Sequence, residues 1–180
     1  MASFFTNLLN RARKDGGGET APGTVSKKKR TVMVKELRER DRRRMLKHFL
    51  ALDDSDRLLR FGTVLPDEGV EAYVGRIDFS RDTVYGVYNR VFKLVAVGHL
   101  AFAPKEKSPG KVVTTKDTVA EFGVSVSKSA RGLGIGSKLF ERAAIRCRNQ
   151  DVDTLYMHCL SSNKVMMRIA RKAGMEIERE

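Results

Sequence analysis

The sequence predicts an α/β (α+β) fold, in which helices flank a mixed, mainly antiparallel sheet. Three observations support this fold class. Several segments repeat apolar residues at helical spacing, and three consecutive segments rich in Val, Phe and Tyr are separated by turn residues, as in a strand meander. A glycine-rich stretch then joins the last of these strands to an amphipathic helix. At 180 residues and 41% apolar, the chain is sufficient for one domain with an appendage.

Residues 1–30 are expected to form a flexible basic arm with a short amphipathic segment. The apolar residues of that segment share one helical stripe: Phe4, Phe5, Leu8, Leu9 and Ala12. Because about 12 residues make only a marginal helix in water, we expect this helix to form when docked on its own domain, a partner or a membrane surface. Residues 15–30 combine Gly, Pro and small polar residues with four consecutive basic residues, and are predicted to be a flexible linker.

The folded domain is expected over residues 31–180. Its Val, Phe and Tyr content predicts strands at 31–37, 83–89, 92–103, 118–127 and 154–160. Apolar periodicity predicts helices through Met45 and Leu50, from Pro66 to Ile77, directly after the glycine stretch, and from Ser162 to Ala173. Residues 104–111 are predicted to form a mobile hairpin connection.

The positive charge lies mainly at the front of the chain. Of the net +13, residues 1–52 carry +9, from 14 basic and 5 acidic residues. Such an arm attracts nucleic acid, anionic lipid or an acidic partner without specifying any of them, and a solvated tail is the alternative. No apolar run approaches the roughly 18 residues that span a bilayer, and no secretory signal is recognisable, so a cytoplasmic location is expected. Cys147 and Cys159 lack the paired spacing of a disulfide framework or a zinc site, and are predicted to be small core residues.

The stretch 131–140, "RGLGIGSKLF", places three glycines ahead of a helix. Free N–H groups in a first helical turn attract anions, so a phosphate-binding loop is one interpretation. The spacing fails the P-loop pattern G-x-x-x-x-G-K-[ST], and G-x-G-x-G is not the dinucleotide fingerprint G-x-G-x-x-G. A glycine-rich turn without a ligand stays open.

A third interpretation comes from the flanking segments. The strand "AEFGVSV", the glycine loop, a strand ending at "SSN" and the helix "KVMMRIARKAGM" together resemble the GNAT superfamily of acyl-CoA N-acyltransferases over residues 31–180. Arg131, Gly134 and Gly136 match that family's (Q/R)-x-x-G-x-(G/A) loop, which binds the coenzyme A pyrophosphate. "DRLLRFG" and "VGRIDFSRD" resemble more closely the branch whose domains acetylate protein lysines in bacteria.

The resemblance implies acetyl-CoA as co-substrate and no metal. The pyrophosphate would be held by the backbone amides of six residues: Gly132, Leu133, Gly134, Ile135, Gly136 and Ser137. Arg131 or Lys138 would add charge. The strand of Val124 and Val126 should separate from the strand ending at Leu160, through a β-bulge of the kind that commonly opens such an edge, and expose its polar groups to the pantetheine arm. Asn163 would bond that arm, or alternatively only the backbone of its own helix.

Glu121 is the candidate general base, because a lysine acceptor with pKa about 10.4 must lose a proton before it attacks. Its place in an apolar strand predicts burial and a raised pKa, and a structural ion pair with an arginine is the alternative. The amide of Val124 would polarise the thioester carbonyl. Many relatives carry a general-acid tyrosine where this chain has Ala170, so Tyr156 and Ser162 are candidate substitutes, a strand aromatic and a helix cap being the alternatives.

Other chemistry is not indicated. His48, His99 and His158 have no metal-like spacing, and His158 and Cys159 should point to opposite faces of their strand. Relatives usually add two strands after the last helix, whereas at most one fits before Glu180. The domain is therefore either shortened or completed by the N-terminal segment or a partner. The partners expected are the amine acceptor, on a protein lysine or a small molecule, and a second copy of the chain in a homodimer. A non-catalytic acyl-CoA-binding regulator and a nucleic-acid-binding module remain the alternatives.

Overall fold

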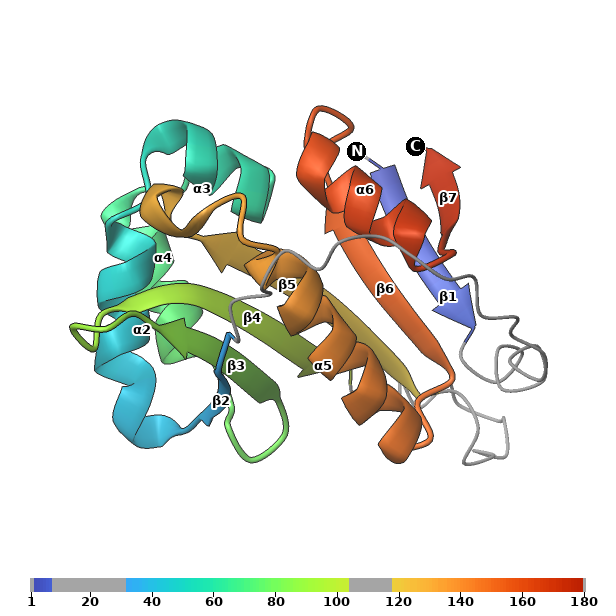
Figure 1. The fold of residues 1–180 in the computed structure, drawn as a ribbon, viewed down its shortest axis with the longest axis horizontal. Helices are drawn as coiled ribbons and strands as arrows, with labels where there is room; N and C mark the ends of the chain where they lie inside the picture. The colour runs from blue at the N-terminus through green and yellow to red at the C-terminus, as the bar shows by residue number, and fades with distance from the viewer. Residues whose placement is uncertain (1, 8–31, 104–117, 180) are drawn as a thin grey trace, which may run out of the picture.

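The computed structural model describes residues 2–7, 32–103 and 118–179. Its strands are β1 Ala2–Asn7, β2 Val34–Leu37, β3 Thr83–Tyr88, β4 Leu94–Phe102, β5 Val119–Val126, β6 Thr154–Cys159 and β7 Glu176–Arg179. They form one sheet in the order β2-β3-β4-β5-β6-β1-β7 (Figure 1). All neighbouring pairs are antiparallel except β5 and β6, which confirms the mixed, mainly antiparallel sheet.

Helices cover both faces of this sheet (Figure 1). They are α2 Arg42–Leu50, α3 Asp54–Phe61, α4 Asp67–Gly75, α5 Ile135–Asn149 and α6 Lys164–Lys172, with 3-10 turns η1 Glu39–Asp41 and η2 Lys128–Ala130. One core cluster joins α5 and α6 to one face, and a second joins α2 and α4 to the other. The helices thus enclose the sheet between two apolar layers.

Strand β5 contributes to both layers because its side chains alternate. Ala120 and Phe122 are buried in the cluster of α5 and α6. Glu121 and Gly123 therefore face the side of α2, α3 and α4. The chemistry expected of Glu121 accordingly belongs to that side of the sheet.

Most elements agree with those expected from the sequence, and α3 is the addition. Asp53 accepts a hydrogen bond from the Asp56 amide at 2.9 Å and caps its start, while Gly62 ends it with a positive φ of 76°. Only eight residues separate these two signals, and no apolar stripe extends beyond them. The helical period is therefore too short to recognise.

The N-terminal segment differs from its prediction. Residues 2–7 form a strand, β1, and not the beginning of a helix. This strand pairs with β6 on one side and with β7 on the other. Two ladders satisfy more backbone groups than a marginal isolated helix could, so tertiary pairing overrides the helical periodicity. The N-terminal segment thus completes the sheet, which was one of the alternatives left open.

Two other expectations lie outside the described residues. They are the linker at residues 15–30 and the hairpin connection at residues 104–111. After α6 the chain forms one strand, β7, within the limit of at most one that the sequence allowed.

Candidate functional site

The site begins where two neighbouring strands separate. Parallel pairing of β5 with β6 starts at Val119 opposite Thr154 and ends at Glu121 opposite Tyr156. Over the described residues no further pair joins these two strands, although β5 continues to Val126. The separation predicted for this strand is therefore confirmed.

The mechanism of separation is not the expected β-bulge. The ladder between β4 and β5 runs without a register shift. The shift found in the described part of the sheet lies between Val87 and Tyr88, on β3. Pairing between β5 and β6 ends at Glu121 and Tyr156, while β5 stays in register with β4.

The open edge of β5 carries backbone polar groups. Ser127 donates its N–H to the carbonyl of Val95 at 2.8 Å. In an antiparallel ladder such pairs alternate, so the odd-numbered residues of β5 bond to β4 and the even-numbered ones point toward β6. Val124 and Val126 consequently direct their N–H and C=O groups into the opening. One of these groups is already used, because the carbonyl of Val126 accepts the Arg131 Nε at 3.1 Å.

The glycine loop follows at the end of that edge. Gly132 and Gly134 have φ values of 77° and 75°, and Gly134 is the N-cap of α5. These positive angles explain two glycines, because other residues are strained there. Gly136 has no positive φ, and a Cβ atom on it would make only an ordinary contact with Ile169 at 3.4 Å, so neither strain nor crowding requires a glycine there.

The first turn of α5 presents unsatisfied donors. No side chain caps this helix. The first amide with a backbone partner at its start is that of Lys138, which bonds the Gly134 carbonyl at 3.0 Å. The preceding amides of Ile135, Gly136 and Ser137 have no acceptor within the helix. Together with the helix dipole, they make this end of α5 suited to a phosphate.

The side-chain charges beside the loop are less available than the sequence suggested. Arg131 pairs with Asp56 of α3 at 2.7 Å. Lys138 pairs with Glu141 at 3.1 Å. Arg131 thus ties the loop to α3, and the donors of this loop that lack a partner among the described residues are backbone amides.

Asn163 lies at the start of α6 as expected. Its Oδ1 accepts the Met166 amide at 3.2 Å, so it caps the helix. The alternative role, bonding the backbone of its own helix, is therefore observed for the Oδ1 atom. The Nδ2 donors remain for a ligand, since no hydrogen bond recorded in the described chain uses them.

Glu121 stands at the vertex where β5 and β6 part. It is exposed, so the predicted burial of this residue is wrong, and none of the ion pairs between described residues includes it. The reason lies in strand alternation. Ala120 and Phe122 point into the core beside α5, so Glu121 points to the opposite face, where the buried cluster of α2 and α4 includes no residue of β5. Tyr156 lies directly opposite on β6, and Ser162 is exposed in the turn before α6. The structure thus brings Glu121 and Tyr156 together.

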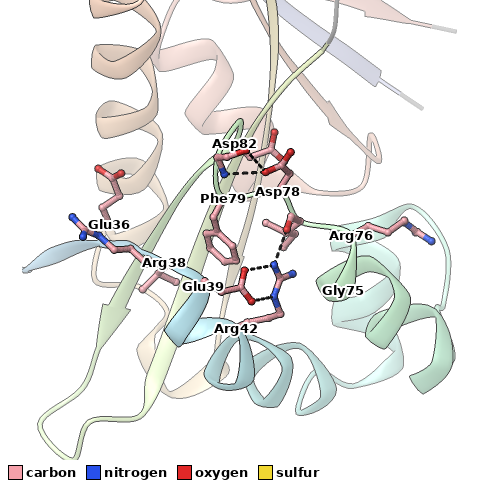
Figure 2. Close-up of a pocket in the computed structure, with 12 residues that line it drawn as sticks. Glu36, Arg38, Glu39, Arg42, Gly75, Arg76, Asp78, Phe79 and Asp82 are labelled. Atoms are coloured by element: carbon pink, nitrogen blue, oxygen red, sulfur yellow. Dashed lines mark hydrogen bonds and ion pairs between the residues drawn. The ribbon is translucent and has the colours of Figure 1, made fainter.

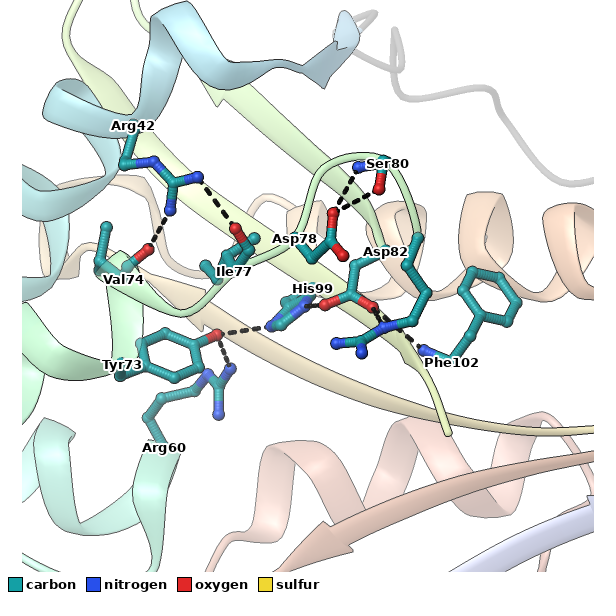
Figure 3. Close-up of polar contacts among 11 residues, drawn as sticks. Arg42, Arg60, Tyr73, Val74, Ile77, Asp78, Ser80, Asp82, His99 and Phe102 are labelled. Carbon is teal, nitrogen blue, oxygen red and sulfur yellow. Dashed lines mark hydrogen bonds and ion pairs between the residues drawn. The ribbon is translucent and has the colours of Figure 1, made fainter. Parts of the chain in front are cut away.

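A chain of polar contacts joins Arg60, Tyr73, His99 and Asp82 (Figure 3). His99 lies opposite Gly123 in the ladder of β4 and β5, two residues from Glu121. The Nη2 atom of Arg60 donates to the Tyr73 hydroxyl at 2.7 Å. That hydroxyl lies 2.8 Å from the Nδ1 atom of His99, whose Nε2 atom lies 2.9 Å from the Asp82 carboxylate. Arg81 donates to the other oxygen of Asp82 at 3.0 Å.

Burial and hydrogen bonding determine the protonation of His99, Tyr73 and Asp82. Burial lowers the pKa of His99 and raises the pKa of Tyr73. Burial alone would raise the pKa of Asp82, but hydrogen bonds from Arg81 and His99 outweigh it and the pKa is lowered. His99 is therefore neutral at pH 7, with its Nε2–H donating to Asp82 and its Nδ1 accepting from the Tyr73 O–H.

The sequence did not indicate this chain of polar contacts. Arg60 stood out only through the family resemblance, and His99 was considered only as a metal ligand. The available signal was a histidine within the apolar strand "LVAVGHLAF", where a buried polar side chain needs partners. Asp82 and Tyr73 come from other elements, so the sequence could not identify these partners.

A second hollow of about 750 Å³ lies between β2–η1 and the connection from α4 to β3 (Figure 2). Arg42 fills much of its wall: it pairs with Glu39, donates to the carbonyls of Val74 and Ile77, and stacks on Phe79 at 4.9 Å. None of the predicted site residues lines this hollow. Its arginine is used in fixing the helix α2 to its neighbours.

The cysteines and His158 agree with their predictions. Cys147 and Cys159 are buried and unpaired, and burial raises the pKa of Cys147 to about 12. His158 is exposed while Cys159 is buried, so the two point to opposite faces. Within the ranges that the structure describes, no group of His, Cys, Asp or Glu could hold a metal ion, and no helix is long and apolar enough to cross a membrane.

Known proteins resemble both the sequence and the fold. The model of the acetyltransferase (GNAT) family matches residues 30–175. The GNAT domain of S. lividans PAT superposes with a TM-score of 0.64 at 19% identity, covering 82% of each chain. Glucosamine-6-phosphate N-acetyltransferase from Arabidopsis thaliana gives 0.54 at 18%, covering 84% of this chain and 95% of the other. An aminoglycoside antibiotic 6′-N-acetyltransferase from Acinetobacter baumannii gives 0.57 at 16%, covering 83% and 95%.

Proposed function

The chain belongs to the GNAT family of acetyltransferases, and we propose that it moves the acetyl group of acetyl-CoA to a primary amine by direct attack within a ternary complex. The acceptor is a protein lysine or a small amine. The observation that carries this proposal is the open edge of β5, which runs from the exposed Glu121 to the uncapped N-terminus of α5. One ligand can therefore lie along both features.

Each end of that edge suits one part of acetyl-CoA. The amides of Gly132 to Ser137 would hold the pyrophosphate, because the left-handed glycines leave the backbone uncovered and no cap occupies it. The groups of Val124 and Val126 that point into the opening would bond the amides of the pantetheine arm. The Nδ2 atom of Asn163 would add one donor from the opposite side.

The proposed reaction takes place beside Glu121, where β5 and β6 separate. Glu121 first takes the proton of the ammonium group, directly or through water, which its exposure allows. The neutral nitrogen then attacks the thioester carbon, and the carbonyl electron pair moves to the oxygen, which the Val124 amide stabilises. The nitrogen loses its second proton to water. The carbon–sulfur bond then breaks, and the thiolate takes a proton from water. Tyr156, which lies opposite Glu121 in the ladder, and Ser162 are the alternative acids.

The fold alone does not select the acceptor. The structural neighbours are named for a sugar phosphate and for an aminoglycoside, among others. The loops around residues 60–80 lie on the same side as Glu121, and we expect them to determine the acceptor. Primary amines are therefore the class to test first.

The test combines a substrate panel with one substitution. Protein, acetyl-CoA and a panel of lysine peptides, polyamines and small amines are mixed, and released thiol is followed. We expect thiol release with at least one acceptor, and a loss of turnover of about 10²-fold or more in Glu121→Gln. Glu36→Gln, at an exposed position on β2 and three strands away from β5, is the matched control and should keep full turnover. A thermal shift with acetyl-CoA but no thiol release would favour the non-catalytic regulator. The absence of both a thermal shift and thiol release would refute the proposal.

A further inference from the structure

Arg60 occupies an unusual position beside the reactive edge. It comes from α3, and its guanidinium lies over Gly123 of β5, where a Cβ atom would approach the Cζ atom to 2.7 Å. Gly123 is two residues beyond Glu121 and adjacent to Val124 in the strand. Any larger residue at this position would displace the guanidinium, so the glycine permits the contact.

Aromatic rings and a hydroxyl hold this guanidinium in place. Its Cζ atom lies 4.9 Å from the ring centre of Phe61, 5.3 Å from that of Tyr73 and 5.9 Å from that of Phe49. The Tyr73 hydroxyl fixes the Nη2 atom (Figure 3). A flat cation stacked in this way keeps its charge and loses most of its freedom.

The cation lacks a balancing anion. None of the ion pairs formed by the described residues includes Arg60, and its buried Nε atom has no hydrogen-bond partner there. Other arginines of this half of the molecule are paired: Arg57 with Asp67, Arg81 with Asp82, and Arg131 with Asp56. Because an unpaired, partly buried charge is costly, a missing negative partner is expected at this place.

We propose that Arg60 is a further residue of the acyl-transfer centre, whose guanidinium stabilises the negative oxygen formed when the amine adds to the thioester. The inference rests on the proposed function and deepens it. The Val124 amide approaches that oxygen within the plane of the sheet, while Arg60 supplies charge from the face that also carries Glu121. As the new carbon–nitrogen bond forms, the oxygen gains the carbonyl electron pair, and it returns that pair when the carbon–sulfur bond breaks.

Tyr73, His99 and Asp82 are positioning residues for Arg60. The carboxylate of Asp82 accepts the Nε2–H of His99, so the free Nδ1 lone pair of His99 directs the Tyr73 O–H away from Arg60. The oxygen of Tyr73 then faces the guanidinium as an acceptor. Loss of any of these groups would loosen the guanidinium without removing its charge.

The test compares two ligands that need no turnover. S-carboxymethyl-CoA places a carboxylate near the acyl oxygen, and S-ethyl-CoA has a neutral group there. By calorimetry we expect the wild-type chain to bind S-carboxymethyl-CoA at least tenfold more tightly. Arg60→Met should abolish that preference and leave the affinity for S-ethyl-CoA unchanged, which also verifies folding. Arg43→Gln removes an equal charge from an exposed site on α2 and should keep the preference.

The outcomes separate this inference from the proposed function. Tight binding of both ligands with no preference would overturn the role of Arg60 and leave the acetyltransferase proposal intact. Binding of neither ligand would overturn both. In turnover with acetyl-CoA, Arg60→Met should lower kcat by about 10²-fold with little change in KM. Malonyl-CoA, whose acyl chain carries a carboxylate, serves as a second donor. If Arg60→Met lost turnover only with malonyl-CoA, Arg60 would bind the carboxylate of the acyl chain, and the oxyanion role would be refuted.

A conservative variant tests the positioning residues. Tyr73→Phe keeps the ring that stacks on Arg60 and removes only the hydroxyl, so we expect a fall in kcat of about tenfold and a weaker preference for S-carboxymethyl-CoA. A change in melting temperature without either effect would show that Tyr73 is only structural.

Discussion

The guanidinium of Arg60 lies directly against Gly123: a Cβ atom on the glycine would come within 2.9 Å of three guanidinium atoms. One element of the helical layer thereby touches the strand whose edge is open to a ligand. The contact links α3 to β5 two residues from Glu121, and it is possible because position 123 carries no side chain.

Replacing that glycine is the most local perturbation available. Gly123→Ala should displace Arg60 from its aromatic contacts, lower the free energy of unfolding by about 1–3 kcal/mol and reduce turnover. Gly75→Ala is the matched control, because a Cβ atom there meets nothing within 4 Å and alanine favours a helix. That variant should be stabilised by up to about 1 kcal/mol. Urea unfolding measures both, and equal effects of the two substitutions would contradict the contact.

The glycine loop allows a second comparison. Gly134→Ala forces alanine into a positive φ of 75°, which should cost about 1–2 kcal/mol although no atom obstructs the methyl group. Gly136→Ala has no such strain, and its methyl group would only contact Ile169 at 3.4 Å. We therefore expect a much smaller change in unfolding free energy for Gly136. A larger effect at Gly136 would mean that close packing of the two helices, and not backbone strain, governs this loop.

The element types could be predicted where long periodic segments determine them. The meander of β3, β4 and β5, the parallel β6 and the helices α5 and α6 follow from patterns that burial enforces on every turn or pleat. The helix α3 and the strand β1 could not be predicted in this way. The first is too short to show a period, and the second follows a helical pattern that pairing with β6 and β7 overrides.

The candidate site also contains residues that could be predicted from the sequence and residues that could not. The glycine loop and Glu121 lie in continuous motifs, so their positions could be predicted, but the exposure of Glu121 depends on how much of that face of β5 the helices cover. The chain from Arg60 to Asp82 joins α3, α4, β4 and the connection before β3. Contacts of that kind depend on tertiary packing, which no local spacing encodes.

His48 gives a prediction for acid stability. Burial lowers its pKa from 6.5 to about 4, with Arg60 and Lys93 contributing, and its ring contacts the Leu94 carbonyl and Ser125. A histidine with a lowered folded pKa takes up its proton more readily when unfolded. Its contribution is therefore complete above about pH 6.5 and lost as the pH falls toward 4, by up to about 3 kcal/mol.

Chemical unfolding between pH 7 and pH 4 measures this effect. His48→Gln should reduce the slope of stability against pH in that window, because glutamine does not titrate. Gln150→Ala, at an exposed position after α5, removes no titratable group and is the control, which should keep the slope. Since His99 also has a lowered pKa, part of the slope should remain in His48→Gln. An unaltered slope in that variant would contradict the buried neutral state of His48.

The N-terminal strand makes the last prediction. Because β1 lies between β6 and β7, deletion of residues 2–7 removes two ladders and leaves β6 with an unpaired edge. We expect the melting temperature to fall by more than about 5 °C. The exposed edge should also promote pairing with a second copy of the chain, visible by gel filtration. Thr6→Pro tests the same ladder at full length, since proline cannot donate a backbone hydrogen bond and Thr6 lies opposite Leu155. If both variants kept the melting temperature of the intact chain, β1 would contribute nothing to the sheet, and β7 would have to be held by other contacts.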